Sequence, residues 1–242
     1  MKKTAEKIWL EIPDDIVVKE GAEPIDWLKF EEMKVLDGKY LVREIRNEEK
    51  ELIDIAEVFK TGFPVIKDTE FDILFESWGV KLLLGGDENF NRGDNFGVIT
   101  ERVEDGKIVS CCFSRIWKKQ RNVEIIVTAS HKDLKDAVAG IMISLKDKYF
   151  EKCGVEMVFA WLAAEHYASQ LILRDLNYKF LGIVPGFYRI WAGKNENGKD
   201  IYKRTIEIFA QKFFHGAEKM STRHLKLLKE AKDVLVPWWD EK

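Results

Sequence analysis

Cysteine is scarce in this sequence, which limits the covalent cross-links that the chain can form. The 242 residues contain three cysteines, of which Cys111 and Cys112 are adjacent. Neighbouring residues of a strand point to opposite faces, so these two are poorly placed to bridge each other. A sparse, odd number of cysteines is typical of a reduced, cytoplasmic protein rather than of a secreted disulfide scaffold.

Long apolar runs are also missing. No stretch approaches the roughly 18 consecutive apolar residues that a membrane-spanning helix requires, and the longest core-like run, 155–164, is interrupted by Glu156. The basic N-terminal segment is not followed by the apolar region that a secretory signal needs. We therefore expect a cytoplasmic protein with no membrane partner.

The chain has neither an excess of one charge nor the spacing of a metal site. Its 39 basic and 42 acidic residues give a formal net charge of −3, which gives no reason to expect binding to nucleic acid or to an anionic surface. The four histidines show no HxxxH spacing and the cysteines no CxxC spacing. We expect no metal and no nucleic-acid partner.

What is present predicts one main domain with two extensions. A composition that is 46% hydrophobic and 33% charged supports a sizeable core and a well-solvated surface. Only five prolines occur, and none clusters into a linker. We expect an N-terminal extension over 1–38, a main domain over 39–210 and a C-terminal helical extension over 211–242. The first of these holds two short apolar runs, at 8–12 and 16–18.

The hydrophobic pattern predicts alternating strands and helices. Polar and apolar residues alternate at 39–46, Asp105-Gly106 is typical of a tight hairpin turn, and 132–152 has apolar positions at helical spacing. We expect strands at 39–46, 96–103, 107–117, 122–129, 155–163, 179–191 and 201–209, and helices from an Asn47 cap to Gly62, at 71–84, 132–152, 164–176 and 210–232. This order predicts an α/β (α+β) fold with a mixed central sheet flanked by helices.

The residues after the strand 122–129 carry the first of two partial motifs. They read Ser130-His131-Lys132-Asp133-Leu134-Lys135-Asp136-Ala137. With the order of elements over about 39–210, this resembles a divergent member of the GCN5-related N-acetyltransferase (GNAT) superfamily. There, a loop of the form (Arg/Gln)-x-x-Gly-x-(Gly/Ala) opens the central helix and binds the coenzyme A diphosphate through backbone N–H groups.

The match to that loop is incomplete. In one register Lys132 takes the basic position, Lys135 replaces the glycine and Ala137 is the closing small residue; a shifted register uses Lys135, Val138 and Gly140. Loss of the glycine matters because glycine lets the backbone approach a phosphate closely, whereas two lysines supply attraction with a looser cradle. The alternative is that both lysines are simply solvated.

The second partial motif runs from His166 to Tyr178. Many members of the superfamily read Asn-x-x-(Ala/Ser)-x-x-x-Tyr-x-x-x-Gly-Phe there. In this chain Ser169 is kept, His166 replaces the asparagine, Leu173 replaces the tyrosine, and Asn177-Tyr178 stands for Gly-Phe. The resemblance makes that tyrosine the acid that protonates the leaving thiolate, which leucine cannot do. Tyr188 and Tyr178 are candidates to replace it, with simple packing as the alternative.

The resemblance implies an acyl-CoA co-substrate, acetyl-CoA or another, and a set of residues to hold it. The thioester is expected against the backbone of 126–129, and the diphosphate at the helix start. The cofactor-binding candidates are therefore Ile126, Val127, Ala129, Lys132, Lys135, Ala137 and Ser169.

Glu124 is the favoured general base, because a carboxylate between apolar neighbours has its proton affinity raised by desolvation. The alternative is that it faces solvent. His166 is a second candidate base or water relay, or else a hydrogen-bonding group at a helix start. Tyr188 completes the catalytic candidates, as an acid. Cys111 or Cys112 could in principle carry an acyl group, but we favour buried core cysteines.

Three functions remain open. The favoured one is direct acyl transfer from acyl-CoA to a small amine or an amino-acid-like acceptor. The alternative is a non-catalytic GNAT-like module that binds a ligand or partner, as the missing glycine and tyrosine indicate. A transferase using another donor, such as aminoacyl-tRNA, is less favoured because there is no basic patch. The resemblance to the superfamily allows a homodimer, although the sequence does not identify a dimer interface.

Overall fold

The computed structural model describes residues 25–91, 93–134 and 136–215. The strands are β1 (Met33–Val35), β2 (Tyr40–Glu44), β3 (Asn95–Arg102), β4 (Ile108–Trp117), β5 (Asn122–Ser130), β6 (Met157–Ala163), β7 (Lys179–Lys194) and β8 (Asp200–Phe213). The α-helices are α2 (Glu49–Gly62), α3 (Ser77–Leu83), α4 (Val138–Lys152) and α5 (Tyr167–Asp175). Single 3₁₀ turns are η2 (Pro64–Ile66), η3 (Asp72–Phe75) and η4 (Lys118–Gln120).

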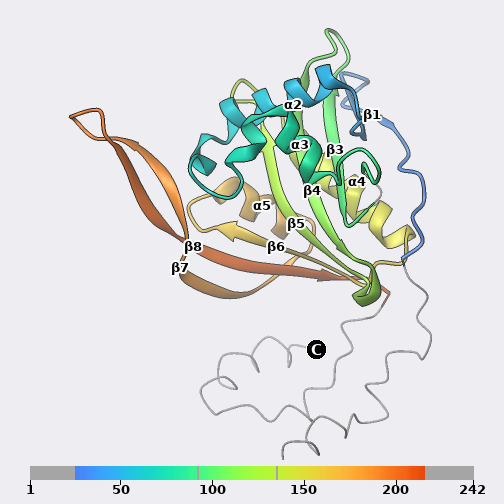
Figure 1. The fold of residues 1–242 in the computed structure, drawn as a ribbon. Helices are drawn as coiled ribbons and strands as arrows, with labels where there is room; N and C mark the ends of the chain where they lie inside the picture. Colours follow the sequence, from blue (N-terminus) through green and yellow to red (C-terminus); the bar gives the residue numbers. More distant parts are fainter. Residues whose placement is uncertain (1–24, 92, 135, 216–242) are drawn as a thin grey trace, which may run out of the picture.

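Within these residues the strands form one sheet in the order β1-β2-β3-β4-β5-β6-β8-β7. Among the described pairings only β5 and β6 are parallel, joined through α4, and the others are antiparallel. Helices α2 and α3 lie on one face, and the long β7–β8 hairpin projects beyond the body of the molecule (Figure 1). The predicted mixed sheet flanked by helices is confirmed.

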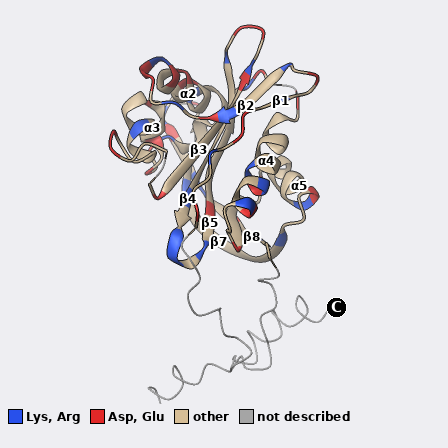
Figure 2. Cartoon of the chain, turned by 90° about the vertical axis from the view of Figure 1, so that its right-hand side faces the viewer, with Lys and Arg blue, Asp and Glu red and all other residues tan. Residues whose placement is uncertain are grey.

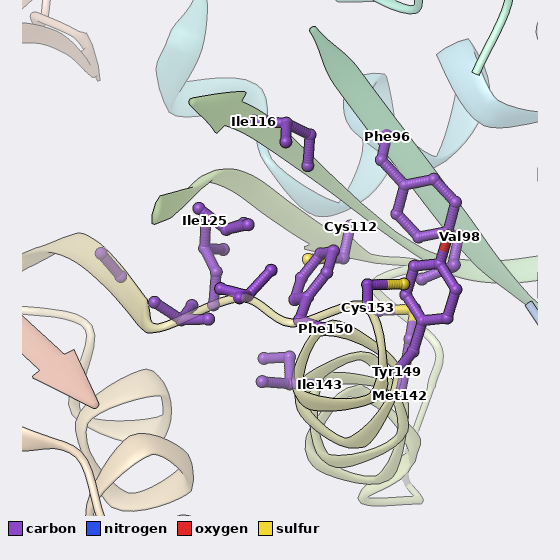
Figure 3. Packing of buried hydrophobic residues seen from close by; sticks show 14 of the residues in the cluster. Phe96, Val98, Cys112, Ile116, Ile125, Met142, Ile143, Tyr149, Phe150 and Cys153 are labelled. Atoms are coloured by element: carbon purple, nitrogen blue, oxygen red, sulfur yellow. The ribbon is translucent and has the colours of Figure 1, made fainter. Parts of the chain in front are cut away.

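Two apolar clusters fill the two faces of the sheet. The first lies between the sheet and α4 and α5, and includes Met142, Phe150 and Leu173 (Figure 3). The second lies under α2 and α3, and includes Phe59 and Leu84. We refer to the two sides as the α4 face and the α2 face.

A buried ionic group ties β2, α2 and β3 together. The guanidinium of Arg43 donates to both carboxylate oxygens of Glu51, at 3.0 and 2.8 Å, and to Glu101 at 3.0 and 2.6 Å. The side chains of Arg43 and Glu51 are 5% and 6% exposed. Removing one member of such a group leaves an uncompensated buried charge, so it holds α2 firmly on the sheet.

The C-terminal end of α2 sits directly on the end of β5. A methyl group built at Gly62 would lie 1.7 Å from the carbonyl oxygen of Ser130. Contacts of that kind are essentially never below 3.0 Å, so only glycine allows this approach. The position of the Ser130–His131 peptide, and hence of the chain entering α4, therefore depends on Gly62.

Several helix boundaries differ from the sequence predictions. Helix α2 begins at Glu49 after Glu48, which makes no side-chain cap, while the Asn47 amide donates to Asp87 at 3.3 Å; the predicted Asn47 cap was wrong. The single helix predicted at 71–84 is broken, because Glu76 is extended with φ −124° and ψ 143° between η3 and α3.

The helix predicted from residue 132 starts at Val138 instead. A turn precedes it, in which the N–H of Leu134 donates to the His131 carbonyl at 2.9 Å and the N–H of Asp133 to the His131 imidazole at 3.3 Å. Side-chain capping of this kind competes with helix formation. The described residues between His131 and Val138 are therefore a loop, which bears directly on the phosphate-binding prediction.

The two extensions are described only in part. Residues 25–38 pack on the main domain, where Ile25 and Phe30 join the core and Trp27 stacks on Tyr149 at 5.7 Å. The apolar runs at 8–12 and 16–18 lie outside the described residues, as do 216–242. The helix predicted from 210 was wrong at its start, since β8 continues to Phe213. The division into a domain and two extensions stays a prediction.

Charges of both signs are interspersed over the described elements (Figure 2). No helix in the described part of the chain has the length and apolar character needed to cross a membrane.

Candidate functional site

The most distinctive feature of the sheet is an irregularity in β5 at Ile126. Phe113 of β4 pairs with Val127 and Ser114 pairs with Ile125, so Ile126 has no partner in β4. On the other side, the parallel pairing of β5 with β6 ends at Ile125 and Ala160. Strand β5 continues to Ser130 and β6 to Ala163, so the two strands separate at the bulge.

The bulge also changes which side chains of β5 face which core. Val123 and Ile125 lie in the α4-face cluster, whereas Val127 and Ala129 lie in the α2-face cluster. The side chains of Val127 and Ala129 are buried, at 7% and 3% exposure. Val127 and Ala129 can therefore offer only backbone atoms to a cofactor. This agrees with the expectation that the thioester lies against the backbone of 126–129.

The start of α4 lies just beyond the end of β5. The first turn of a helix has N–H groups without intrahelical partners, and the helix dipole adds partial positive charge there. The side chain of Val138 is buried with Tyr40 and Val109, whereas Ala137 is exposed, so its single methyl group does not block this end. Lys132 is exposed in the preceding turn, and Lys135 lies outside the described residues.

One acidic residue stands at this helix start. The Asp136 carboxylate accepts hydrogen bonds from the Lys39 ammonium at 2.5 Å and from the Tyr40 hydroxyl at 2.6 Å. The Lys39 hydrogen bond, followed by that of Tyr40, lowers the pKa of Asp136. Its negative charge is thus compensated from β2, and the loop can still present cationic groups. Sequence reasoning missed Lys39 and Tyr40, because they lie about a hundred residues from this loop.

The second partial motif falls at the start and end of α5. His166 is exposed at the N-terminal end of the helix, where its Nδ1 lies 2.5 Å from the Ser169 hydroxyl. This contact agrees with the helix-start alternative for His166, and it occupies the Ser169 hydroxyl. A methyl group at Gly140 would meet Ile172 at 3.5 Å, an ordinary van der Waals contact, so the side chain of Ile172 in α5 lies against α4.

Asn177 occupies the position that glycine has in the superfamily motif. Its φ is +64°, a left-handed conformation that asparagine tolerates better than most residues. The N–H of Tyr178 donates to the Leu173 carbonyl at 2.9 Å, which is the Schellman closure of a helix. The replacement Asn177-Tyr178 for Gly-Phe is therefore structurally conservative.

Tyr178 is committed to the core. Its side chain is buried, and its hydroxyl donates to Asp147 at 2.8 Å. Burial, followed by the charge of Asp147, raises the pKa of Tyr178 well above its usual value. Leu173 is also buried. Neither residue faces the end of β5, which leaves Tyr188 as the remaining candidate acid.

Glu124 lies on the α2 face, one step before the strands separate. Its side chain is 19% exposed and lies 3.6 Å from the Arg115 guanidinium, so the fully solvated alternative does not hold. Burial raises the pKa of Glu124, and the charge of Arg115 partly opposes this. A half-buried carboxylate with a raised pKa is suited to accept a proton.

Tyr188 belongs to the same electrostatic neighbourhood. Burial raises its pKa most, and the charges of Glu70, Glu124 and Glu207 raise it further. Its backbone N–H donates to the Thr205 hydroxyl at 3.3 Å. The charge of Glu124 thus acts on Tyr188, whereas His166 lies at the helix start described above.

Sequence reasoning missed several residues beside this pair. Glu207 is 4% exposed in β8, and a group of aromatic side chains in mutual contact lies on the same face of the sheet: Phe159, Trp161, Phe187 and Phe209. A signal was present in the alternation of Thr205, Glu207 and Phe209 along β8. It could not be interpreted without the sheet order, which places β8 between β6 and β7.

The segment after α2 reaches the projecting hairpin and closes one side of this region. The Lys67 ammonium lies 2.7 Å from Asp200 and 5.6 Å from the centre of the Trp191 ring. The Tyr202 hydroxyl donates to Asp68. These contacts join the turn around η2 to β7 and β8.

The cysteines offer no reactive thiol among the described residues. All three are buried and free, and burial strongly raises the pKa of Cys111. Cys112 lies 2.9 Å from the buried Lys146 ammonium, beneath α4. This placement favours the core interpretation of both adjacent cysteines over an acyl-cysteine.

Comparison with known proteins gives a clear result at the level of structure only. No protein-family model matches the sequence, and no curated protein matches it significantly. The structure is similar to ribosomal-protein-S5-alanine acetyltransferase from Vibrio fischeri, with a TM-score of 0.58 and 12% identity over 76% of this chain and 97% of that one.

Two further solved structures agree. A probable acetyltransferase of the GNAT family from Chromobacterium violaceum gives a TM-score of 0.57 and 10% identity over 80% of this chain and 96% of that one. The protein yncA from Salmonella typhimurium, solved with its cofactor acetyl-CoA, gives 0.52 and 13% over 74% and 95%. At these identities the likeness establishes the fold: the chain has the fold of GNAT acetyltransferases.

Proposed function

We propose that this protein is an acyl-CoA-dependent N-acyltransferase that transfers an acyl group, with acetyl-CoA as the favoured donor, directly to an amine. The observation that carries the proposal is the coincidence of three features at one place. The β5–β6 separation at Ile126, the open start of α4 and the half-buried Glu124 lie along one strand and its exit. The shared fold with the acetyl-CoA-bound Salmonella protein supports it.

The chain's own groups have distinct tasks in this reaction. The N–H groups at the start of α4 bind the diphosphate, with Lys132 and Lys135 adding positive charge and Ala137 leaving room. The side chains of the gap exclude water, while the N–H of Ile126, which has no register partner, donates to the acyl carbonyl oxygen. Bound acyl-CoA supplies an acyl group activated as a thioester.

Proton movement then falls to the two side chains on the α2 face. Glu124 accepts the proton that the acceptor ammonium must lose before its nitrogen can form the new C–N bond. As the C–S bond breaks, Tyr188 donates its hydroxyl proton to the departing sulfur, and the second proton that the nitrogen loses on becoming an amide restores the Tyr188 hydroxyl. His166, at the start of α5, is a second candidate base acting through water, and Ser169 a contact for the donor.

Titration calorimetry with coenzyme A tests the donor site. A matched pair of variants separates charge from size at the helix start: Ala137→Glu adds a carboxylate, and Ala137→Gln adds a neutral group of the same size. We expect binding by the wild type and by Ala137→Gln, and a loss of about tenfold or more in Ala137→Glu, since an anion at this end repels a diphosphate. Equal affinity in both variants, or no binding by the wild type, would refute the proposal.

A second function has specific support. The loop lacks a glycine, and Asp136 stands at the helix start, both of which suit a non-catalytic module that binds a ligand or partner. Saturable coenzyme A binding without acyl transfer to any amine, measured by thiol release from acetyl-CoA, would favour that alternative.

A further inference from the structure

Part of the α2 face of the sheet has no α-helix packed on it, although the η2 turn borders it at β7. The cluster under α2 and α3 takes its strand residues from β3, β4 and β5, and, within the described residues, none from β6, β7 or β8. In Figure 1 the β7–β8 hairpin extends past these helices. This bare region begins where β5 and β6 separate, beside Glu124.

Aromatic side chains cover this bare region. The rings of Trp161 and Phe187 are stacked at 5.2 Å with an interplanar angle of 18°, and Phe209 lies 4.7 Å from Trp161. Phe159 lies 5.7 Å from Phe209, and Tyr188 lies 4.6 Å from Phe187. We call these five residues the aromatic face.

The aromatic face is accessible rather than part of a core. Phe187 is 44% exposed, and the other four are only partly buried. Large rings gathered on an uncovered surface are typical of a binding surface. They are also the groups that attract a cation through the negative face of the ring.

A buried carboxylate without a cation lies among these rings. Glu207 pairs across the sheet with Ala163 and is two residues from Phe209, so it shares the face of Trp161 and Phe209. It is 4% exposed and accepts a hydrogen bond from the Thr205 hydroxyl, but no Lys, Arg or His of the described chain forms an ion pair with it. An uncompensated buried carboxylate is unfavourable, and a ligand cation that reaches it gains the missing interaction.

Glu124 supplies the second carboxylate. It lies opposite Phe159 of the aromatic face in the β5–β6 register, one pair before the last paired positions, Ile125 and Ala160. Glu207 lies opposite Ala163, four residues further along β6 on the same face, so a cation that pairs with Glu207 lies at the far end of the aromatic face from Glu124. Its organic body would lie over the rings.

We infer that the acceptor is a compact organic cation: an amine, charged as an ammonium, that carries an aromatic or apolar body. The body packs on Trp161 and Phe187, and the ammonium lies beside Glu207, on the face of the sheet that also carries Glu124. The inference rests on the proposed function for its chemistry, because it names the acceptor class of that same site. It excludes anionic acceptors and makes small hydrophilic amines poor ones.

Three probes of nearly equal shape test this without any mutation. Calorimetry in the absence of a donor compares 2-phenylethylamine, a cation, with 2-phenylethanol, which is neutral, and phenylacetate, an anion. We expect affinity to fall in that order, by about tenfold or more between cation and neutral probe, since the buried carboxylate rewards only the cation. We expect a dissociation constant of about 1 mM for the amine. Equal binding of the three probes, or no binding of the amine at a concentration tenfold above that value, overturns the inference.

Matched variants locate the site. Trp161→Leu should weaken 2-phenylethylamine binding roughly three- to thirty-fold, as expected for loss of a cation–π contact, and Glu207→Gln should weaken it while leaving the neutral probe unchanged. Trp78→Leu and Glu57→Gln are controls, because both residues are exposed on the helices α3 and α2. Unchanged binding in both site variants, or an equal loss in the controls, contradicts the assignment.

The two proposals fail separately. If coenzyme A binds but the three amine probes show no order, the acceptor class is wrong and acyl transfer stands. If the probes follow the expected order but coenzyme A does not bind, the site takes organic cations and the transferase proposal is wrong. A second copy of the chain could instead cover the aromatic face. A dimer that 2-phenylethylamine does not dissociate would therefore also overturn the inference.

Discussion

The contact between Gly62 and the end of β5 allows a prediction in which two opposing effects can be weighed. Gly62 does not have a left-handed φ, so alanine fits the backbone there. Replacing a helical glycine by alanine normally stabilises a protein by about 0.5–1 kcal/mol, through helix propensity and a less flexible unfolded chain. On that basis alone Gly62→Ala would be more stable than the wild type.

Packing predicts the opposite sign. The added methyl would lie 1.7 Å from the Ser130 carbonyl oxygen and 2.6 Å from its carbon, where 3.0 Å is the practical minimum. The backbone of α2 or β5 must move by at least 1.3 Å, and a carbonyl cannot rotate away as a side chain can. Overpacking of this kind costs about 1–3 kcal/mol or more, which outweighs the gain. We expect a net loss of stability.

Urea unfolding followed by circular dichroism measures the outcome. The matched control is Gly182→Ala, whose methyl group would have nothing within 4 Å and whose φ is not left-handed; it should lie within about 0.5 kcal/mol of the wild type. Because Ser130 leads into α4, Gly62→Ala should also weaken coenzyme A binding. A Gly62→Ala variant as stable as the wild type, with an unchanged m-value, would show that the packing argument is wrong.

Three further predictions concern charge. Replacing Arg115 by methionine removes the cation that opposes the raised pKa of Glu124, so the acidic limb of the pH–rate profile should move to higher pH; a shift to lower pH contradicts the assignment of Glu124 as base. Burial raises the pKa of Glu207, so its contribution to stability is present below about pH 4.5 and is lost as pH rises through the pKa of the folded state. The melting temperature of Glu207→Gln should therefore rise relative to that of the wild type between pH 4 and pH 8. A difference in melting temperature that does not change with pH would contradict this. Glu51→Ala leaves Arg43 buried without its bidentate partner and should cost about 3–5 kcal/mol in urea unfolding, whereas a loss below about 1 kcal/mol would mean that water or Glu101 compensates.

Sequence periodicity predicted most of the fold for a physical reason. Apolar strands such as β6, and amphipathic helices such as α2 and α5, can be recognised from local patterns that depend only on nearby residues. Errors arose where a local group competed with the helix. His131 caps the turn before α4, and Glu76 adopts an extended conformation between η3 and α3; neither is visible in apolar spacing.

The candidate site was less predictable, because its parts come from distant segments. Glu124 was identified from its apolar neighbours, and its half-burial agrees with that reasoning. The bulge at Ile126 was not predicted, since the apolar alternation of β5 continues unbroken through it while the two faces exchange. Lys39 beside Asp136, and Glu207 beside Trp161, become neighbours only through the order of the strands in the sheet.

The short parallel seam between β5 and β6 has a mechanical consequence. Residues Asn122–Ile125 on one side and Met157–Ala160 on the other are the only rungs that connect the β1–β5 half of the sheet with the β6–β8 half in the described chain. Each half is braced by its own antiparallel ladder, so bending is concentrated in this seam. A small rotation of one half against the other would widen or narrow the gap between β5 and β6 without deforming either half. The same four residue pairs would be the axis of that rotation.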